Sequence, residues 1–298
     1  LIFNEGYAAS SGRHWFREDL CEEALRLGRV LAALAPDEAE VHGLVALMEF
    51  QSSRLRARVD AEGAPILLEN QDRTRWDRAQ IQRGVTALGA AAQALHRRGS
   101  GWGPYALQAA LAECHAVAPS TAATDWHRIV MLYDALLGLT TSPVVALNRA
   151  VAVAMADPDN GPRAALDIVD HLDGLDGSPA LPGVRAELLQ RLGRHAEAHA
   201  LLGSLTDDGV GVFYDACALV SLGEQVLAGE RFEQAAVAGY DEVECALRRV
   251  GTIRSTTAVE TAAARRPRTC ATARLTAASH SPLSRTAPTD WTTIAMVG

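Results

Sequence analysis

The sequence predicts an all-α protein in which antiparallel helical hairpins stack one after another as a solenoid. Alanine and leucine dominate the apolar content and aromatic residues make up only 5% of the chain, which suits close-packed helices better than strands. Apolar residues also recur at helical spacing. A small pattern repeats in the second half at intervals of 36, 33 and 30 residues, as expected for stacked helical units.

The repeating pattern is a small or apolar residue followed by bulky or apolar residues four and seven positions later. These positions share one helical face, so each set predicts a buried stripe. Gly193 and Gly223 each stand five residues before a patterned alanine, where a glycine can end one helix before the next begins. The four sets are Ile129/Tyr133/Leu136, Ala165/Val169/Leu172, Ala198/Leu202/Leu205 and Ala228/Phe232/Ala235.

These intervals, with the segments RLGRHAEA and SLGEQVLAGERFEQA, resemble the tetratricopeptide repeat (TPR). Near the N-terminus, the second half of such a unit fits Ala24, Gly28, Leu31 and Pro36. The Trp-Leu-Gly-Tyr positions of the repeat's first helix are largely absent. A generic antiparallel helical bundle therefore remains the alternative.

Helix ends follow from capping residues. Pro36 ends one helix, and Asp37 with Glu40 predicts a capping box for the next. Thr124 or Asp125 predicts the start of the helix that carries Ile129. Ser142 followed by Pro143 predicts another start.

Three segments depart from the helical pattern. Residues 59–72 predict an irregular loop or short hairpin, because DAEGAP is turn chemistry and the apolar run after it is short. Glycines at 99, 101 and 103 predict a linker. From residue 250, a Thr/Ala/Ser/Arg/Pro composition without apolar period predicts disorder. The predicted domains are therefore 1–98, 104–249 and a tail at 250–298.

Residues 54–77, RLRARVDAEGAPILLENQDRTRWD, are dense in charges of both signs. Their end, ENQDRTRWD, resembles a signature in the C-terminal extension of one group of bacterial extracytoplasmic-function (ECF) sigma factors, with Asn70 where an acid is expected. Further similarity lies in residues 1–7 (LIFNEGY), 20–34 (LCEEALRLGRVLAAL) and 142–154 (SPVVALNRAVAVA). The candidate interaction residues are Glu69, Gln71, Asp72, Arg73, Arg75, Trp76 and Asp77.

The same segment has an internal structural interpretation. Thr74 with Asp77 would form a capping box. Arg54, Arg56 and Arg58 would pair with Asp72 and Asp77 across the loop. On this interpretation we expect Trp76 and Asp72 to be structural, and Arg73 and Arg75 to be exposed. Charged residues beside a tryptophan are equally what interaction hot spots use.

Candidate catalytic and metal-binding motifs are weak. His195 and His199 have the spacing of two zinc ligands, but no third ligand is identifiable and Glu197 does not directly follow the first histidine. Cys114 and His115 are adjacent, so on a helix their side chains diverge, and Cys114 is expected in the core. The sequence predicts no enzyme, metal or cofactor; an enzyme built from residues distant in sequence is the least favoured alternative.

The net charge and the composition argue against nucleic acid and membranes as partners. The net charge of −8 divides into −12 over residues 1–250 and +4 over 251–298, so the body would repel nucleic acid. No run approaches the ~20 apolar residues of a membrane helix. Scattered cysteines without CxxC spacing suit a reducing cytoplasm; they are Cys21, Cys114, Cys217, Cys245 and Cys270.

The resemblance implies a regulatory module of an ECF sigma factor. Its partners would be the sigma-factor core domains and RNA polymerase, and it would modulate transcription initiation. The promoter-melting and promoter-reading helices of that family are missing, so this chain is expected neither to bind promoter DNA directly nor to initiate transcription alone. We interpret it as a fragment of a longer product. The alternative is a free-standing TPR-like scaffold that binds a peptide or protein.

Overall fold

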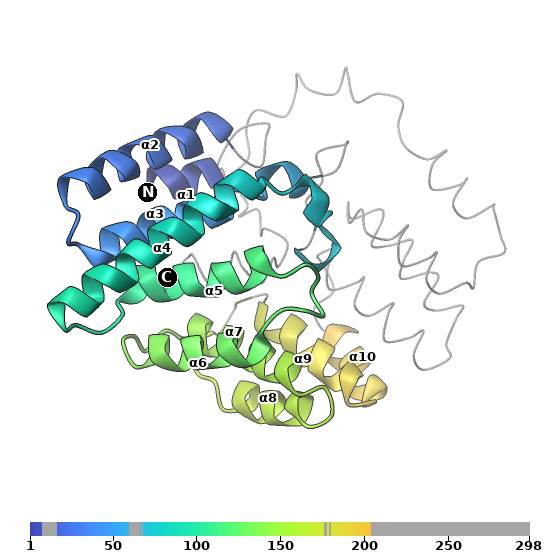
Figure 1. The fold of residues 1–298 in the computed structure, drawn as a ribbon. Helices are drawn as coiled ribbons and strands as arrows, with labels where there is room; N and C mark the ends of the chain where they lie inside the picture. The colour runs from blue at the N-terminus through green and yellow to red at the C-terminus, as the bar shows by residue number, and fades with distance from the viewer. Residues whose placement is uncertain (8–16, 60–65, 67, 176–177, 179, 204–298) are drawn as a thin grey trace, which may run out of the picture. The chain divides into compact units, whose positions relative to one another are not determined.

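The computed structural model describes residues 1–7, 17–59, 66, 68–175, 178 and 180–203. Helices account for nearly all of the regular structure in these residues (Figure 1), which confirms the all-α prediction. The described residues fall into two compact units, one up to residue 175 and the other from residue 178. Each unit is described by itself.

The first unit begins with five helices, and α3 is the central one. They are α1 (Ile2–Tyr7), α2 (Glu18–Leu34), α3 (Ala39–Ser52), α4 (Arg78–Arg98) and α5 (Pro104–Val117). Helix α3 packs against α2, α4 and α5. Every residue from Val45 to Arg54 is buried, as expected of a helix that is surrounded on all sides.

The unit continues with α6 (Trp126–Leu137), α7 (Pro143–Ala156) and α8 (Gly161–Asp170), each packed on the helix before it. The second unit contains α9 (Ala180–Arg191) packed on α10 (His195–Gly203). This neighbour-on-neighbour packing suits helical hairpins, while stacking as a TPR-like solenoid stays a prediction.

Several predicted stripe positions are buried. Leu172 lies beyond the end of α8 and is partly exposed. Gly193, with φ of 72°, follows the end of α9 as predicted. The side chain of Leu202, together with Leu205, Gly223, the set at 228–235 and the tail, lies outside the described residues. The buried members are Ile129, Tyr133, Leu136, Ala165, Val169 and Ala198.

The glycine-rich segment at 99–103 is a tight helix–helix turn. Gly99 has φ of 63° and closes α4, and Pro104 begins α5. Helix α5 packs closely on α3: a Cβ added to Gly43 would lie 2.6 Å from the backbone nitrogen of Ala106. The predicted domain boundary at 98–104 therefore differs from the structure, in which both sides of the turn share one core.

The predicted capping box at Asp37 and Glu40 is wrong. Helix α3 begins after Glu38 without a side-chain cap. Asp37 instead pairs with Arg97 at 2.9 Å. Glu40 accepts hydrogen bonds from the Tyr105 and Ala106 backbone nitrogens, at 2.8 and 3.1 Å. It thus caps α5, a helix 65 positions away in sequence.

Two other predicted helix starts are confirmed. Asp125 accepts a hydrogen bond from the Arg128 backbone nitrogen at 2.9 Å. Ser142 and Pro143 occupy the cap and first positions of α7. Among the described helices, none is both long and apolar enough to cross a membrane.

Candidate functional site

The signature segment ends in short turns that lead into α4. The described parts of residues 54–77 form three 3-10 turns, η1 (Leu55–Ala57), η2 (Leu68–Asn70) and η3 (Arg73–Arg75). Residues 60–65 and 67 lie outside the described part of the chain, as does the Glu69 side chain. Of the predicted loop or hairpin at 59–72, the structure describes residues 59, 66 and 68–72, which form no α-helix.

Two aspartates in this segment act as helix caps. Asp72 accepts from the backbone nitrogen and the hydroxyl of Thr74, at 2.9 and 2.6 Å. These donors hold the pKa of the Asp72 carboxyl below its usual value. Asp77 caps α4 by accepting from the Gln80 backbone nitrogen at 2.9 Å. The predicted Thr74–Asp77 capping box is therefore replaced by two separate caps.

Arg73 is the side chain that fastens this segment to α5. Its Nη1 donates to the carbonyl oxygens of His115 and Ala118, at 2.6 and 2.9 Å. Its guanidinium lies 4.5 Å from the ring centroid of Trp76. Burial lowers the pKa of the Arg73 guanidinium, with Arg78 and Arg54 adding to the shift. The carbonyls it binds are at the C-terminal end of α5, where unpaired oxygens need donors.

The expected division of roles is therefore partly wrong. Trp76 is buried, at 3% exposure, as predicted. Arg73, expected to be exposed, is half-buried. Asp72 is exposed but caps η3 through Thr74, which is compatible with the structural role expected of it. Arg75 is exposed as predicted.

Gln71 is buried and its Nε2 donates to the Ile66 carbonyl oxygen at 2.9 Å. Asp77 is exposed beside Arg75 in the chain. The segment thus directs Gln71, Arg73 and Trp76 inward and leaves Asp72, Arg75 and Asp77 at the surface.

A buried polar cluster joins the N-terminal helix to the start of this segment. The Tyr7 hydroxyl donates to Gln51 Oε1 at 2.9 Å and accepts from Arg54. Arg54 Nη2 also donates to Gln51 Oε1, at 2.6 Å. Arg58 donates to the Tyr7 carbonyl oxygen at 2.6 Å and lies 3.7 Å from its ring centroid. Residues 1–7 and the start of the 54–77 segment are thereby held together.

The predicted ion pairs across the loop are absent. Arg54 and Arg58 instead bind the Tyr7 and Gln51 groups of this cluster. Arg56 is exposed and approaches Glu18 at 3.9 Å. A buried guanidinium needs acceptors, and the Tyr7 hydroxyl and the Gln51 amide oxygen accept from Arg54.

Sequence reasoning also missed a buried carboxylate in the centre of the unit. Glu49, at 1% exposure, accepts from Arg29 at 2.6 and 2.9 Å and from Arg83 at 3.3 Å. It ties α2 and α4 to α3. Its signal in the sequence was a single acid in the apolar run LVALMEFQSS.

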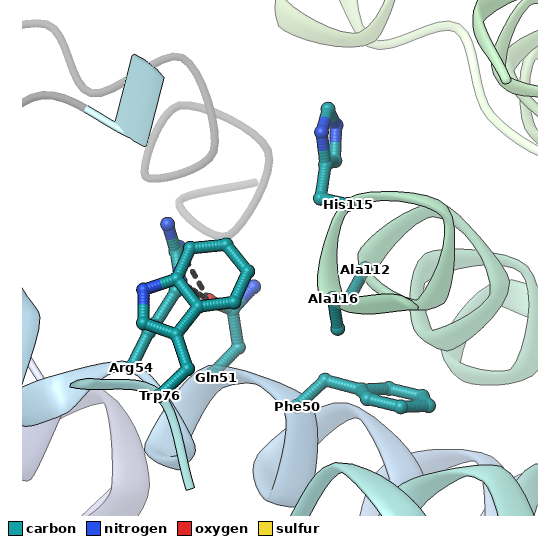
Figure 2. Close-up of a pocket in the computed structure, with 7 residues that line it drawn as sticks. All are labelled: Phe50, Gln51, Arg54, Trp76, Ala112, His115 and Ala116. Carbon is teal, nitrogen blue, oxygen red and sulfur yellow. Dashed lines mark hydrogen bonds between the residues drawn. The ribbon is translucent and has the colours of Figure 1, made fainter. Parts of the chain in front are cut away.

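A cavity lies between α3, the signature segment and α5. Figure 2 shows Trp76 beside Arg54 and Gln51, with His115 on α5 across the cavity. Its volume of about 20 Å³ suits roughly one water molecule and is far below the ~300 Å³ of a small-molecule pocket. The lining residues are Phe50, Gln51, Arg54, Trp76, Ala112, His115 and Ala116.

Cys114 and His115, the residues considered for catalysis, both make packing contacts. Cys114 is buried, as predicted, and burial raises the pKa of its thiol to about 11. The His115 ring packs edge-on against Trp126 with 5.3 Å between centroids. No cluster of three or more metal-ligating residues occurs within the described ranges, around His195 and His199 included.

The signature segment lies within the part of the chain that is similar to a known family model. Residues 1–92 match the model of a family of unknown function (DUF6596). Over 199 residues the chain is 48% identical to an uncharacterized protein of Rhizobium meliloti (strain 1021), an alignment that covers 66% of this chain and 45% of that relative. The chain thus spans less than half the length of this relative. No solved structure matches.

Proposed function

We propose that this chain is a regulatory interaction module of an ECF sigma factor, acting in the cytoplasm on transcription initiation. Its partners would be the sigma-factor core domains or RNA polymerase. The resemblance of residues 1–7, 20–34, 69–77 and 142–154 to the extension of those factors is the basis of the assignment. The match of residues 1–92 to a protein family is compatible with it.

The observation that carries the proposal is the way the signature segment is attached to the rest of the first unit. Half-buried Arg73 and buried Trp76 fix a short turn whose outer positions are charged. Asp72 is held in one conformation by Thr74. Charged groups that are already ordered lose little entropy on binding and favour one partner over others.

Arg75 is the outer residue most suited to contact a partner. It is exposed and forms no ion pair with another described residue. An arginine that the fold does not use is free to bind a carboxylate in a bidentate manner. We therefore assign the recognition contact to Arg75, with Asp72 and Asp77 beside it.

Direct DNA binding is not part of the proposed function. Residues 1–250 carry a net charge of −12, and a phosphate backbone would be repelled by such a surface. Fluorescence anisotropy at physiological salt should show the chain binding promoter DNA and random DNA equally weakly. A footprint on one promoter by this chain alone would contradict this statement.

The test measures binding to bacterial RNA polymerase, with and without an ECF sigma-factor core, by biolayer interferometry. Arg75→Glu should raise the dissociation constant at least ~10-fold, the equivalent of ~1.4 kcal/mol. Arg163→Glu is the matched control, because Arg163 is an exposed arginine on α8. Absence of wild-type binding, or equal loss in both variants, would refute the proposal.

A further inference from the structure

The orientation of the buried Gln51 side-chain amide is fixed by its neighbours. Gln51 Oε1 accepts from the Tyr7 hydroxyl at 2.9 Å, and from Arg54 Nη2 and Nε at 2.6 and 3.2 Å. A guanidinium can only donate, so the reversed amide would place N–H groups against N–H groups of Arg54. The amide oxygen therefore faces Tyr7 and Arg54, and Nε2 must point the other way.

Gln51 Nε2 points into the cavity beside Trp76. Figure 2 shows the amide nitrogen on the side that faces α5, and Gln51 is one of the lining residues. The side chain is 5% exposed, and no described residue accepts a hydrogen bond from Nε2. A buried N–H group that lacks an acceptor destabilises a fold, so the cavity is the place where this acceptor is needed.

The walls of the cavity do not supply the acceptor. The alanine methyl groups and the Phe50 ring carry no polar atom, and the indole of Trp76 and the guanidinium of Arg54 are donors only. The His115 ring packs edge-on against Trp126 and forms no hydrogen bond with Gln51. The acceptor must therefore come from a molecule that enters the cavity.

Size restricts what that molecule can be. The volume of about 20 Å³ holds roughly one water molecule. A carboxylate-bearing or ring-bearing ligand needs more room than this. Polar groups also stand on more than one side, because Arg54 and His115 line the cavity together with Gln51, and a bound water needs such neighbours.

We propose that one water molecule is bound in this cavity as a fixed part of the fold and accepts a hydrogen bond from Gln51 Nε2. The water satisfies the one orientation of the amide in which Gln51 can bind Tyr7 and Arg54. It thereby supports the contact between α1 and the start of the signature segment. This inference goes beyond the proposed transcriptional role and does not depend on it.

Nuclear magnetic resonance of the full 298-residue chain, labelled with ¹⁵N and deuterium, tests the water site. Cross-relaxation between water and an amide proton is measured in the laboratory frame and in the rotating frame. The two signals have opposite signs for a water that stays bound, and they do not for a rapidly exchanging surface water. The Gln51 side-chain amide protons should show opposite signs. Gln82 is the matched control, because it is exposed on α4 and should not show them.

Three variants decide what the Gln51 signal means. Tyr7→Phe removes a hydroxyl proton that exchanges with water and could relay the signal, so the signal should persist in this variant. Ala116→Leu fills the cavity and should abolish the signal while circular dichroism stays native. Ala112→Val fills it from a second lining position and serves if Ala116→Leu folds poorly. A wild-type Gln51 signal like that of Gln82, its loss in Tyr7→Phe, or its survival in a folded cavity-filling variant would overturn the proposal.

Discussion

Replacement of Arg73 by alanine should destabilise the first unit, although Arg73 lies in a surface turn. The guanidinium donates to the His115 and Ala118 carbonyl oxygens and covers the Trp76 ring. Its removal leaves the C-terminal end of α5 without these donors. Arg75→Ala, two positions away on an exposed side chain, is the matched control.

The size of the effect follows from these contacts. A hydrogen bond that involves a charged group contributes ~1.5–3 kcal/mol, and a cation over an aromatic ring adds ~0.5–1 kcal/mol. Arg73 is only half-buried, so water can replace part of both hydrogen bonds. We expect a loss of about 2 kcal/mol for Arg73→Ala after this discount. Arg73→Lys should lose about half of that, because the lysine side chain is one atom shorter and lacks the planar guanidinium that covers the Trp76 ring.

Urea unfolding gives the change in free energy, and hydrogen exchange shows where it occurs. Because the chain has two units, a single melting curve mixes their contributions. Hydrogen exchange of the backbone amides at 115–124 should become faster in Arg73→Ala and stay unchanged in Arg75→Ala. The free energy of unfolding of Arg75→Ala should remain within about 0.5 kcal/mol of the wild-type value. Equal destabilisation by both substitutions, or a neutral Arg73→Lys, would refute the assignment of Arg73 as the anchor.

Two further predictions concern buried side chains. Trp76→Ala should cost about 3–5 kcal/mol by urea unfolding, as truncation of a large core residue does; a cost below about 1 kcal/mol would place Trp76 outside the core. Burial raises the pKa values of the Cys21 and Cys114 thiols to about 11, so both should resist maleimide at pH 8 until the chain is unfolded, as peptide mass spectrometry would show. Native labelling at the rate of the unfolded chain would contradict this burial.

Much of the helical architecture could be predicted because its signals are local. Asp125 and Ser142 mark helix starts by short-range backbone geometry, and Gly193 ends a helix by its left-handed conformation. Glu40 shows where local patterns fail. It stands three positions after Asp37, as a capping box requires, yet its carboxylate caps the distant helix α5. A sequence pattern holds no information on whether an acid bonds within its own turn or across the core.

The half-buried position of Arg73, which was expected to be exposed, has a geometric cause. A segment with alternating charges and no recognised period gives no indication of which residues face inward. In a 3-10 turn, residues three positions apart lie on the same side, so Arg73 accompanies Trp76 and Asp72 accompanies Arg75. Recognition of η3 as a 3-10 turn would have been enough to predict the arrangement that the structure has.

Side-chain contacts of the first unit link the N-terminus to the start of the signature segment, and the end of that segment to α5. Tyr7 is bound by Arg54 and Arg58, which begin the signature segment. The same segment ends at Arg73, which binds the last carbonyls of α5. Rigid side-chain networks of this kind are the physical means by which a change at one site can reach another. A displacement of α1 would therefore act first on Arg54 and Arg58. The neighbouring Ser53 carbonyl oxygen accepts from the Asp77 backbone nitrogen at 2.8 Å, which joins this region to the end of the segment. If the proposed regulatory contact is made at Arg75, its effect on the rest of the unit depends on the attachment of this turn to the core through Arg73 and Trp76.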